Sequence, residues 1–107
     1  MYPLGYTLIP MNTLIRTAEF AEWLTGLKDA TAKAAILNRM DRATKGNFGD
    51  SKSLQGGLYE MRIDVGPGYR VYYTQRGLVV YVLLLGGDKR KQDRNIKRAR
   101  EMMRQLE

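Results

Sequence analysis

The sequence predicts an α+β fold, in which a short strand and two helices precede an antiparallel β-meander and a C-terminal helix. Apolar residues recur at helical spacing between residues 19 and 45, alternate between 58 and 75, and return to helical spacing after residue 90. We expect the helices to pack on one face of an antiparallel sheet. The 107 residues match the usual size of one domain, so residues 1–107 are expected to form a single domain.

The N-terminal half is predicted to contain an extension, one strand and two helices. Residues 1–11 hold two prolines and a glycine and end on a second methionine, which favours a loose extension. Residues 12–17 are a short β-prone run. Residues 19–27 have the spacing of an amphipathic helix, with apolar positions at Phe20, Trp23, Leu24 and Leu27. Asp29 is suited to cap a second helix from residue 30 to about 45, and Gly46 to end it.

The C-terminal half is predicted to be a meander followed by a helix. Residues 58–65 and 69–75 alternate apolar and polar positions around a Gly66-Pro67-Gly68 turn. Residues 78–85 are apolar at every position, as expected of a central strand covered on both sides. The pair Gly86-Gly87 is expected to close the meander. Residues 90–106 then form a helix with one apolar face, which consists of Ile96, Ala99, Met103 and Leu106.

Composition excludes several kinds of chemistry. The chain has no cysteine, which excludes disulfides, thiolate catalysis and the usual structural zinc sites. It has no histidine, so acid-base chemistry must use Lys, Arg, Tyr or a carboxylate. The acidic residues lack metal-site spacing, and we expect neither a metal nor a cofactor. No apolar run approaches the roughly 20 residues of a membrane span, and no secretory signal is apparent, so we expect a cytoplasmic protein without membrane partners.

The charge favours a polyanionic partner. Eighteen Lys and Arg residues against 11 Asp and Glu residues give a net charge of +7. A small domain this basic favours nucleic acid ahead of a membrane surface or an acidic protein. Residues 88–107 hold eight basic and four acidic residues, and so carry +4 of the total.

A first candidate site lies on the non-core face of the meander. Arg62 and Arg70 are expected on the same face of adjacent strands, and a register centred on the turn would place Arg62 near Tyr72 and Arg70 near Asp64. Guanidinium groups can clamp a phosphate, and a tyrosine ring can stack on a base. Alternatively, these are ordinary solvated strand residues.

A second candidate site follows the last strand. Lys89, Arg90 and Lys91 surround the expected start of the last helix, whose free amides favour an anion, and Arg94 lies one turn further on. We assign phosphate binding to Arg62, Arg90, Lys91 and Arg94. The alternative is a basic first turn on an exposed helix. Basic residues there oppose the helix dipole, which an anionic ligand would explain.

Four sequence segments together resemble a known family. In chain order they are GNFGD, GPGYR, LLLGGDK and QDRNI. The run from residue 12 to about 105 is similar to the phage-derived, HigB-like "addiction module killer protein" branch of the RelE/ParE toxin superfamily. The resemblance implies a RelE-like α+β fold with a concave sheet. It also implies an antitoxin as partner, typically a helix-turn-helix DNA-binding protein, through which alone the toxin would reach operator DNA.

For the RelE side, the resemblance implies an endoribonuclease that cleaves mRNA in the ribosomal A site. The ribose 2′-hydroxyl attacks the adjacent phosphate, and basic residues stabilise the developing charge. By position, Arg70 in GPGYR matches the arginine of the RelE-type GYR segment, and Lys89 falls where a basic residue follows the last strand. Lys52 lies in the loop that contributes basic residues ahead of the sheet. Tyr72 is added as a catalytic candidate from strand geometry.

One departure from the family pattern concerns the terminal segment. RelE-type enzymes carry a tyrosine there, whereas residues 90–107 contain none and Asn95 stands near that place. The candidates for the general base are then Tyr72, Lys52 and Asp93. Two other functions stay open on the same fold: a ParE-like inhibitor of DNA gyrase without catalysis, and an idle toxin that acts only with its antitoxin as a repressor.

Overall fold

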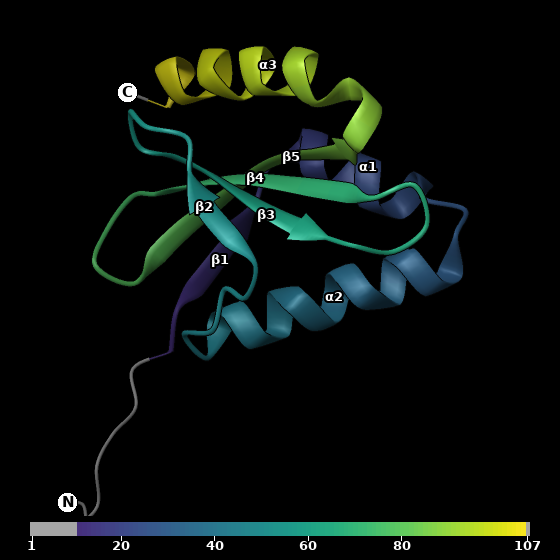
Figure 1. The fold of residues 1–107 in the computed structure, drawn as a ribbon. Coiled ribbons are helices and arrows are strands. Elements are labelled where there is room, and N and C mark those ends of the chain that lie inside the picture. The colour runs from purple at the N-terminus through teal and green to yellow at the C-terminus, as the bar shows by residue number, and fades with distance from the viewer. Residues whose placement is uncertain (1–10, 107) are drawn as a thin grey trace, which may run out of the picture.

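The computed structural model describes residues 11–106, which form a five-stranded mixed sheet with three α-helices (Figure 1). In chain order the elements are β1 (Thr13–Arg16), α1 (Ala18–Gly26), α2 (Ala30–Thr44), β2 (Ser51–Ser53), β3 (Leu58–Ile63), β4 (Tyr69–Gln75), β5 (Val80–Asp88), the short 3₁₀ helix η1 (Lys89–Lys91) and α3 (Gln92–Gln105). The predicted α+β class is confirmed. Residues 1–10 of the predicted extension, which runs to Met11, lie outside the described residues.

The sheet has the order β1-β5-β4-β3-β2. Strands β3, β4 and β5 form the predicted antiparallel meander. Strand β1 pairs with β5 in parallel, so the sheet is mixed rather than wholly antiparallel. The short edge strand β2, which the sequence does not predict, pairs with β3. No helix among residues 11–106 has the length and apolar character that crossing a membrane requires.

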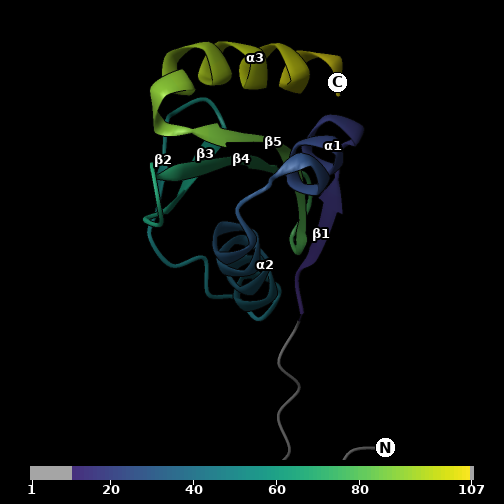
Figure 2. The same cartoon turned by 90° about the vertical axis from the view of Figure 1, so that its right-hand side faces the viewer.

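The helices cover both faces of the sheet, and the prediction that they share one face is wrong. Helix α3 lies on one side of the sheet, while α1 and α2 lie on the other (Figures 1 and 2). The physical reason is that β5 is apolar on both of its faces, and each face needs a cover.

Two hydrophobic cores result. The α1–α2 core joins Phe20, Leu24, Ile36 and Met40 to the strand residues Met61, Val71 and Leu83. The α3 core joins Ala99 and Met102 to the strand residues Leu58, Tyr72, Val82, Leu84 and Leu85. Both cores use side chains of β3, β4 and β5, so each strand of the meander contributes to two layers.

Side-chain caps set the helix starts. The Thr17 hydroxyl accepts a hydrogen bond from the Phe20 amide at 3.0 Å and donates one to the Leu84 carbonyl at 2.6 Å, which ties α1 to β5. The predicted cap of α2 is confirmed, since the Asp29 carboxylate accepts from the Ala32 amide at 3.1 Å. The predicted end is confirmed as well, with Gly46 at a φ of 92°.

Helix α3 begins later than predicted, at Gln92 after the turn η1. Its buried face consists of Asn95, Ala99 and Met102, whereas Leu106 is exposed. Two arginines tie α3 to the rest of the protein. Arg98 pairs with Glu19 of α1 at 2.7 Å, and Arg100 donates to the Leu54 and Gln55 carbonyls at 2.8 and 3.1 Å.

The prediction that Gly86-Gly87 closes the meander is wrong. The pair lies inside β5, which pairs with β4 as far as Asp88. A Cβ atom at Gly86 would overlap the Trp23 indole of α1, and one at Gly87 would overlap the Asn95 amide of α3. These glycines therefore let a helix contact the strand backbone on each face. The predicted start of this strand is wrong too, because Leu78 lies in the preceding turn with 91% of its surface exposed.

Candidate nucleic-acid interface

The two candidate arginines of the meander lie directly opposite each other. Arg62 of β3 pairs with Arg70 of β4, and Glu60 pairs with Tyr72. The predicted register, with Arg62 near Tyr72 and Arg70 near Asp64, is wrong. The pairing is centred on Gly66, whose φ is 57°, rather than on Pro67. The predicted placement of Arg62 and Arg70 on one face is confirmed, because both side chains point to the same side of the sheet as Glu60 and Tyr72.

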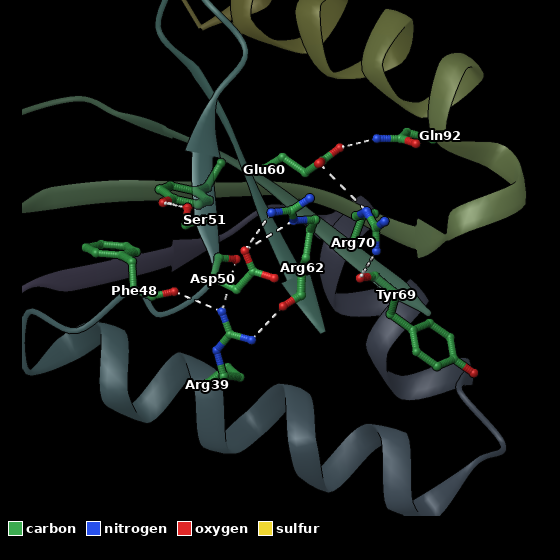
Figure 3. Close-up of polar contacts among 10 residues, drawn as sticks. Arg39, Phe48, Asp50, Ser51, Glu60, Arg62, Tyr69, Arg70 and Gln92 are labelled. Atoms are coloured by element: carbon green, nitrogen blue, oxygen red, sulfur yellow. Dashed lines mark hydrogen bonds and ion pairs between the residues drawn. The ribbon is translucent and has the colours of Figure 1, made fainter. Parts of the chain in front are cut away.

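Each arginine has its own acidic partner, which offsets the repulsion expected between like charges in opposed positions. Arg62 pairs with Asp50 at 2.8 Å at the surface, the two side chains being 39% and 55% exposed (Figure 3). Such an exposed pair stabilises a fold by only about 0–1 kcal/mol, so an incoming phosphate can replace Asp50 at low cost. A hollow of about 220 Å³ lies here, lined by Asp50, Arg62, Asp64 and Arg70.

Arg70 is held in a more buried environment. Its side chain is 11% exposed, and its Nε lies 3.7 Å from Oε1 of the fully buried Glu60. Nη1 donates to the Tyr69 carbonyl at 3.2 Å. The Glu60 carboxylate is fixed in turn by Gln92 of α3, whose amide donates to Oε2 at 2.7 Å (Figure 3). The guanidinium is therefore oriented before any ligand arrives.

Lys89 meets Arg70 around the β3–β4 turn. The Lys89 amide donates to the Gly68 carbonyl at 2.9 Å. Gly68 has a φ of 85°, and a Cβ atom there would lie 3.7 Å from Lys89 Cβ and 3.8 Å from Arg70 Nη1. The fold thus places Arg70 between two other predicted residues, Arg62 and Lys89.

Tyr72 lies on the same face of the sheet as Arg62 and Arg70, but it is covered by α3. Its residue surface is completely buried, and its hydroxyl has no hydrogen-bond partner among residues 11–106. Burial, with the nearby Glu60 carboxylate, raises the pKa of Tyr72 above the ordinary 10.0. The phenol is uncharged at neutral pH and cannot touch an RNA in this structure. Asn95, on the buried face of α3, packs on Gly87.

Asp88 caps η1, where the anion site was predicted, whereas α3 itself begins after Lys91 without a side-chain cap. The Asp88 carboxylate accepts from the Arg90 amide at 3.0 Å, and its other oxygen pairs with the Arg90 guanidinium at 3.2 Å. The hydrogen bonds and charge of Arg90 hold the pKa of Asp88 below its ordinary 3.8. In the described part of the chain, Lys91 and Arg94 are exposed and form no ion pair, so both charges stay available to a ligand.

Lys52 lies directly opposite Glu60 in the sheet, and so at the edge of the face that carries Arg62 and Arg70. It is exposed on the edge strand β2 and lines a second, larger pocket of about 490 Å³. The walls of this pocket are four aromatic rings, which belong to Phe48, Tyr59, Tyr73 and Tyr81. Sequence reasoning missed this pocket because alternating tyrosines on the apolar face of a meander also fit an ordinary core. Among residues 11–106, no three acidic side chains gather where they could hold a metal ion.

The loop between α2 and β2 is held by Arg39. Its guanidinium donates to the carbonyls of Arg62 at 2.6 Å, Phe48 at 2.9 Å and Asp50 at 3.3 Å (Figure 3). Gly49 has a φ of 65°, and a Cβ atom there would lie 2.8 Å from Arg39 Nη2. The GNFGD segment therefore places Phe48 in the aromatic pocket and Asp50 beside Arg62.

Comparison with known proteins identifies a relative of this chain. No model of a known protein family matches the chain. An uncharacterized protein of Haemophilus influenzae is 48% identical over 90 residues, which cover 84% of this chain and 91% of that protein.

Proposed function

We propose that this chain, which belongs to the same family as the uncharacterized Haemophilus influenzae protein, is the toxin of a toxin-antitoxin pair. Its activity would be cleavage of mRNA in the ribosomal A site. The proposal is supported by the resemblance of its motifs to HigB-like RelE/ParE toxins and by an α+β fold compatible with a RelE-like assignment. The partner would be a helix-turn-helix antitoxin, and the site of action the cytoplasm.

The observation that carries the proposal is the position of Arg70, which lies opposite Arg62 on β3 and close to Lys89 at Gly68. The three come from β3, β4 and η1, and Arg70 is oriented by its hydrogen bond to the Tyr69 carbonyl and by the Glu60 carboxylate 3.7 Å away. A fixed guanidinium with two more exposed cations suits a phosphate whose charge grows during reaction. The net charge of +7 favours approach to ribosomal RNA.

In the proposed reaction, the ribose 2′-oxygen attacks the adjacent phosphorus and the bond to the 5′-oxygen breaks. The products are a 2′,3′-cyclic phosphate and a 5′-hydroxyl end. A base takes the 2′-hydroxyl proton, and the leaving 5′-oxygen gains one. Arg70 and Lys89 would stabilise the phosphorane. Of the candidate bases, Asp93 is exposed in the first turn of α3, whereas the Tyr72 phenol is buried.

The test is single-turnover cleavage of mRNA on programmed ribosomes at saturating toxin. We expect Lys89→Ala to lose a hundredfold or more in rate, or roughly 3 kcal/mol of transition-state stabilisation. Arg70 is tested in the double variant Arg70→Ala with Glu60→Gln, so that no buried carboxylate is left unpaired. The matched control is Lys45→Ala, which removes one exposed charge at the end of α2. Equal rates for all three variants and the wild type would overturn the assignment.

Expression in cells without antitoxin tests the wider proposal. We expect translation to stop first, with new mRNA ends detected by primer extension. If DNA supercoiling changes first while mRNA stays intact, the protein is instead a gyrase inhibitor of the ParE kind. If growth is unaffected, it acts only as a partner in repression.

A further inference from the structure

The aromatic pocket is built from rings with nearly parallel planes. Tyr73 stacks on Phe48 with centroids 5.1 Å apart and planes at 12°, and on Tyr59 at 5.4 Å and 19°. Tyr81 is tilted against Phe48 at 4.8 Å. Tyr73 is buried, whereas Phe48, Tyr59 and Tyr81 are half-buried and keep ring surface open to solvent. The pocket thus offers exposed aromatic ring surface on which a flat ligand can pack.

These rings are held in place before a ligand arrives. Arg39 bonds the Phe48 carbonyl at 2.9 Å, and the Tyr73 hydroxyl is hydrogen-bonded to the Ser51 hydroxyl. Little ordering is therefore needed on binding, which favours affinity. The volume of about 490 Å³ lies within the roughly 300–1,000 Å³ usual for small-ligand sites.

The polar part of the lining favours a nucleotide over other flat ligands. None of the lining residues carries a carboxylate, and Lys52 brings a positive charge to the rim of the pocket, at the β2 edge that it shares with the Arg62 face. Asn47, Ser53 and Gln75 add amide and hydroxyl groups able to bond base edges. Aromatic stacking beside a cation is the usual chemistry of single-stranded nucleic acid binding.

The pocket also adjoins the proposed cleavage site. Asp50 lines the hollow with Arg62 and Arg70, and the next residue, Ser51, lines the aromatic pocket. Only the edge strand β2 separates the two, because consecutive strand residues point to opposite faces. An RNA strand that passes over this edge can reach both.

We propose that the aromatic pocket binds one unstacked base of a single-stranded RNA, with Lys52 at the adjoining phosphate. This is a second RNA subsite across the edge of β2 from the proposed cleavage site. It rests on the proposed function only in naming RNA as the ligand, and it requires no catalysis.

The test measures binding of a fluorescein-labelled single-stranded RNA of eight nucleotides to the full chain without ribosomes. We expect Tyr59→Leu, which keeps apolar bulk but removes the ring, to weaken binding about tenfold or more. Tyr59→Phe keeps the ring and should bind like the wild type. Lys52→Ala should weaken binding and lower the slope of log affinity against log salt by about 0.7. Its matched control is Lys28→Ala, which removes an exposed cation before the start of α2, at the opposite end of that helix from Phe48, and should bind like the wild type.

Fluorescence of Trp23 and circular dichroism would verify that each variant is folded. In the wild type, we also expect the RNA to shift the ring NMR resonances of Phe48, Tyr59 and Tyr81. Unchanged affinity in folded Tyr59→Leu, or shifts confined to Arg62, Arg70 and Lys89, would overturn the proposal. A Tyr59→Leu variant that no longer binds the antitoxin but still binds RNA like the wild type would also overturn it, since the pocket would then receive a protein side chain.

The outcomes separate this inference from the proposed function. A chain that binds RNA through Tyr59 but never cleaves mRNA retains the subsite and refutes the catalytic proposal. A chain that cleaves mRNA while Tyr59→Leu binds RNA normally refutes the subsite alone.

Discussion

At the residue scale, the environment of Arg70 differs from that of its neighbour Arg62. Arg70 lies beside the fully buried Glu60, whereas Arg62 pairs with Asp50 at the surface. Removing one partner of a buried charge pair costs roughly 3–5 kcal/mol of stability because the other charge is left alone. Arg70 is therefore both a structural and a proposed catalytic residue, while Arg62 is free to change partners.

Tyr72 provides the prediction at this scale. Its buried hydroxyl has no hydrogen-bond partner in the described part of the chain. A buried polar group without a partner costs about 1–3 kcal/mol, so Tyr72→Phe should leave the free energy of unfolding unchanged or raise it. We also expect an unchanged cleavage rate, because the phenol is covered by α3. Urea unfolding and single-turnover kinetics measure the two quantities.

The pH dependence of stability gives the same variant a second readout. Well below pH 10 the phenol is protonated in both the folded and the unfolded protein, so it does not make the free energy of unfolding depend on pH. Above its ordinary pKa of 10.0 the unfolded chain releases the proton while the folded protein retains it, because burial raises the pKa of Tyr72. Wild type should therefore lose stability relative to Tyr72→Phe as the pH rises past 10. A hundredfold slower cleavage in Tyr72→Phe would instead mean that α3 moves to expose the phenol.

At the element scale, β5 is the strand that contacts both of its neighbouring strands and a helix on each face of the sheet. It pairs with β1 and β4, and its two faces contact α1 and α3. The contacts at its C-terminal end are made through backbone, because Gly86 faces Trp23 and Gly87 faces Asn95. The LLLGGD segment thus packs against two helices, and it also positions Lys89, which directly follows it.

Alanine at Gly87 tests this packing. The added methyl group would overlap the Asn95 amide, so we expect Gly87→Ala to lower the free energy of unfolding by about 1–3 kcal/mol. Asn95→Ala removes the overlapping amide and should restore part of that loss. The same Asn95→Ala change should not rescue Gly86→Ala, whose methyl group meets Trp23 on the opposite face. Urea midpoints that show no rescue, or rescue of both variants, would contradict this packing arrangement.

At the scale of the whole molecule, two cores share one sheet. The α1–α2 core and the α3 core lie on opposite faces, and strands β3 to β5 contribute side chains to both. The Arg98–Glu19 ion pair also joins α3 directly to α1. Because neither core can form without the meander, the described fold should unfold in one cooperative transition.

Trp23, the single tryptophan, reports on this cooperativity from the α1–α2 core. Leu84 lies fully buried in the α3 core, and Ile36 is its counterpart in the α1–α2 core. Leu84→Ala and Ile36→Ala should each lower the free energy of unfolding by about 2–5 kcal/mol. Both should shift the Trp23 fluorescence transition and the circular dichroism transition together. A Leu84→Ala variant whose Trp23 transition does not move would show that the cores unfold separately.

Local patterns were sufficient to predict much of the secondary structure. The limits of β4, the start of α2 at its Asp29 cap and its end at Gly46 all follow from periodicity and capping, which act over a few residues. The shared face of Arg62 and Arg70 follows from the alternation of a strand. The absence of cysteine and histidine limits acid-base chemistry to Lys, Arg, Tyr and carboxylate groups, whatever the fold.

Tertiary structure alone decided how these pieces combine. The parallel pairing of β1, the face that each helix covers and the register centred on Gly66 depend on contacts between residues far apart in the chain. The burial of Tyr72 and the gathering of Phe48 with three tyrosines depend on them too. The sequence by itself determined the elements and the charge, because these depend on neighbouring residues. Packing determined which side chains meet, because one residue of register or one choice of face moves a side chain between core, site and solvent.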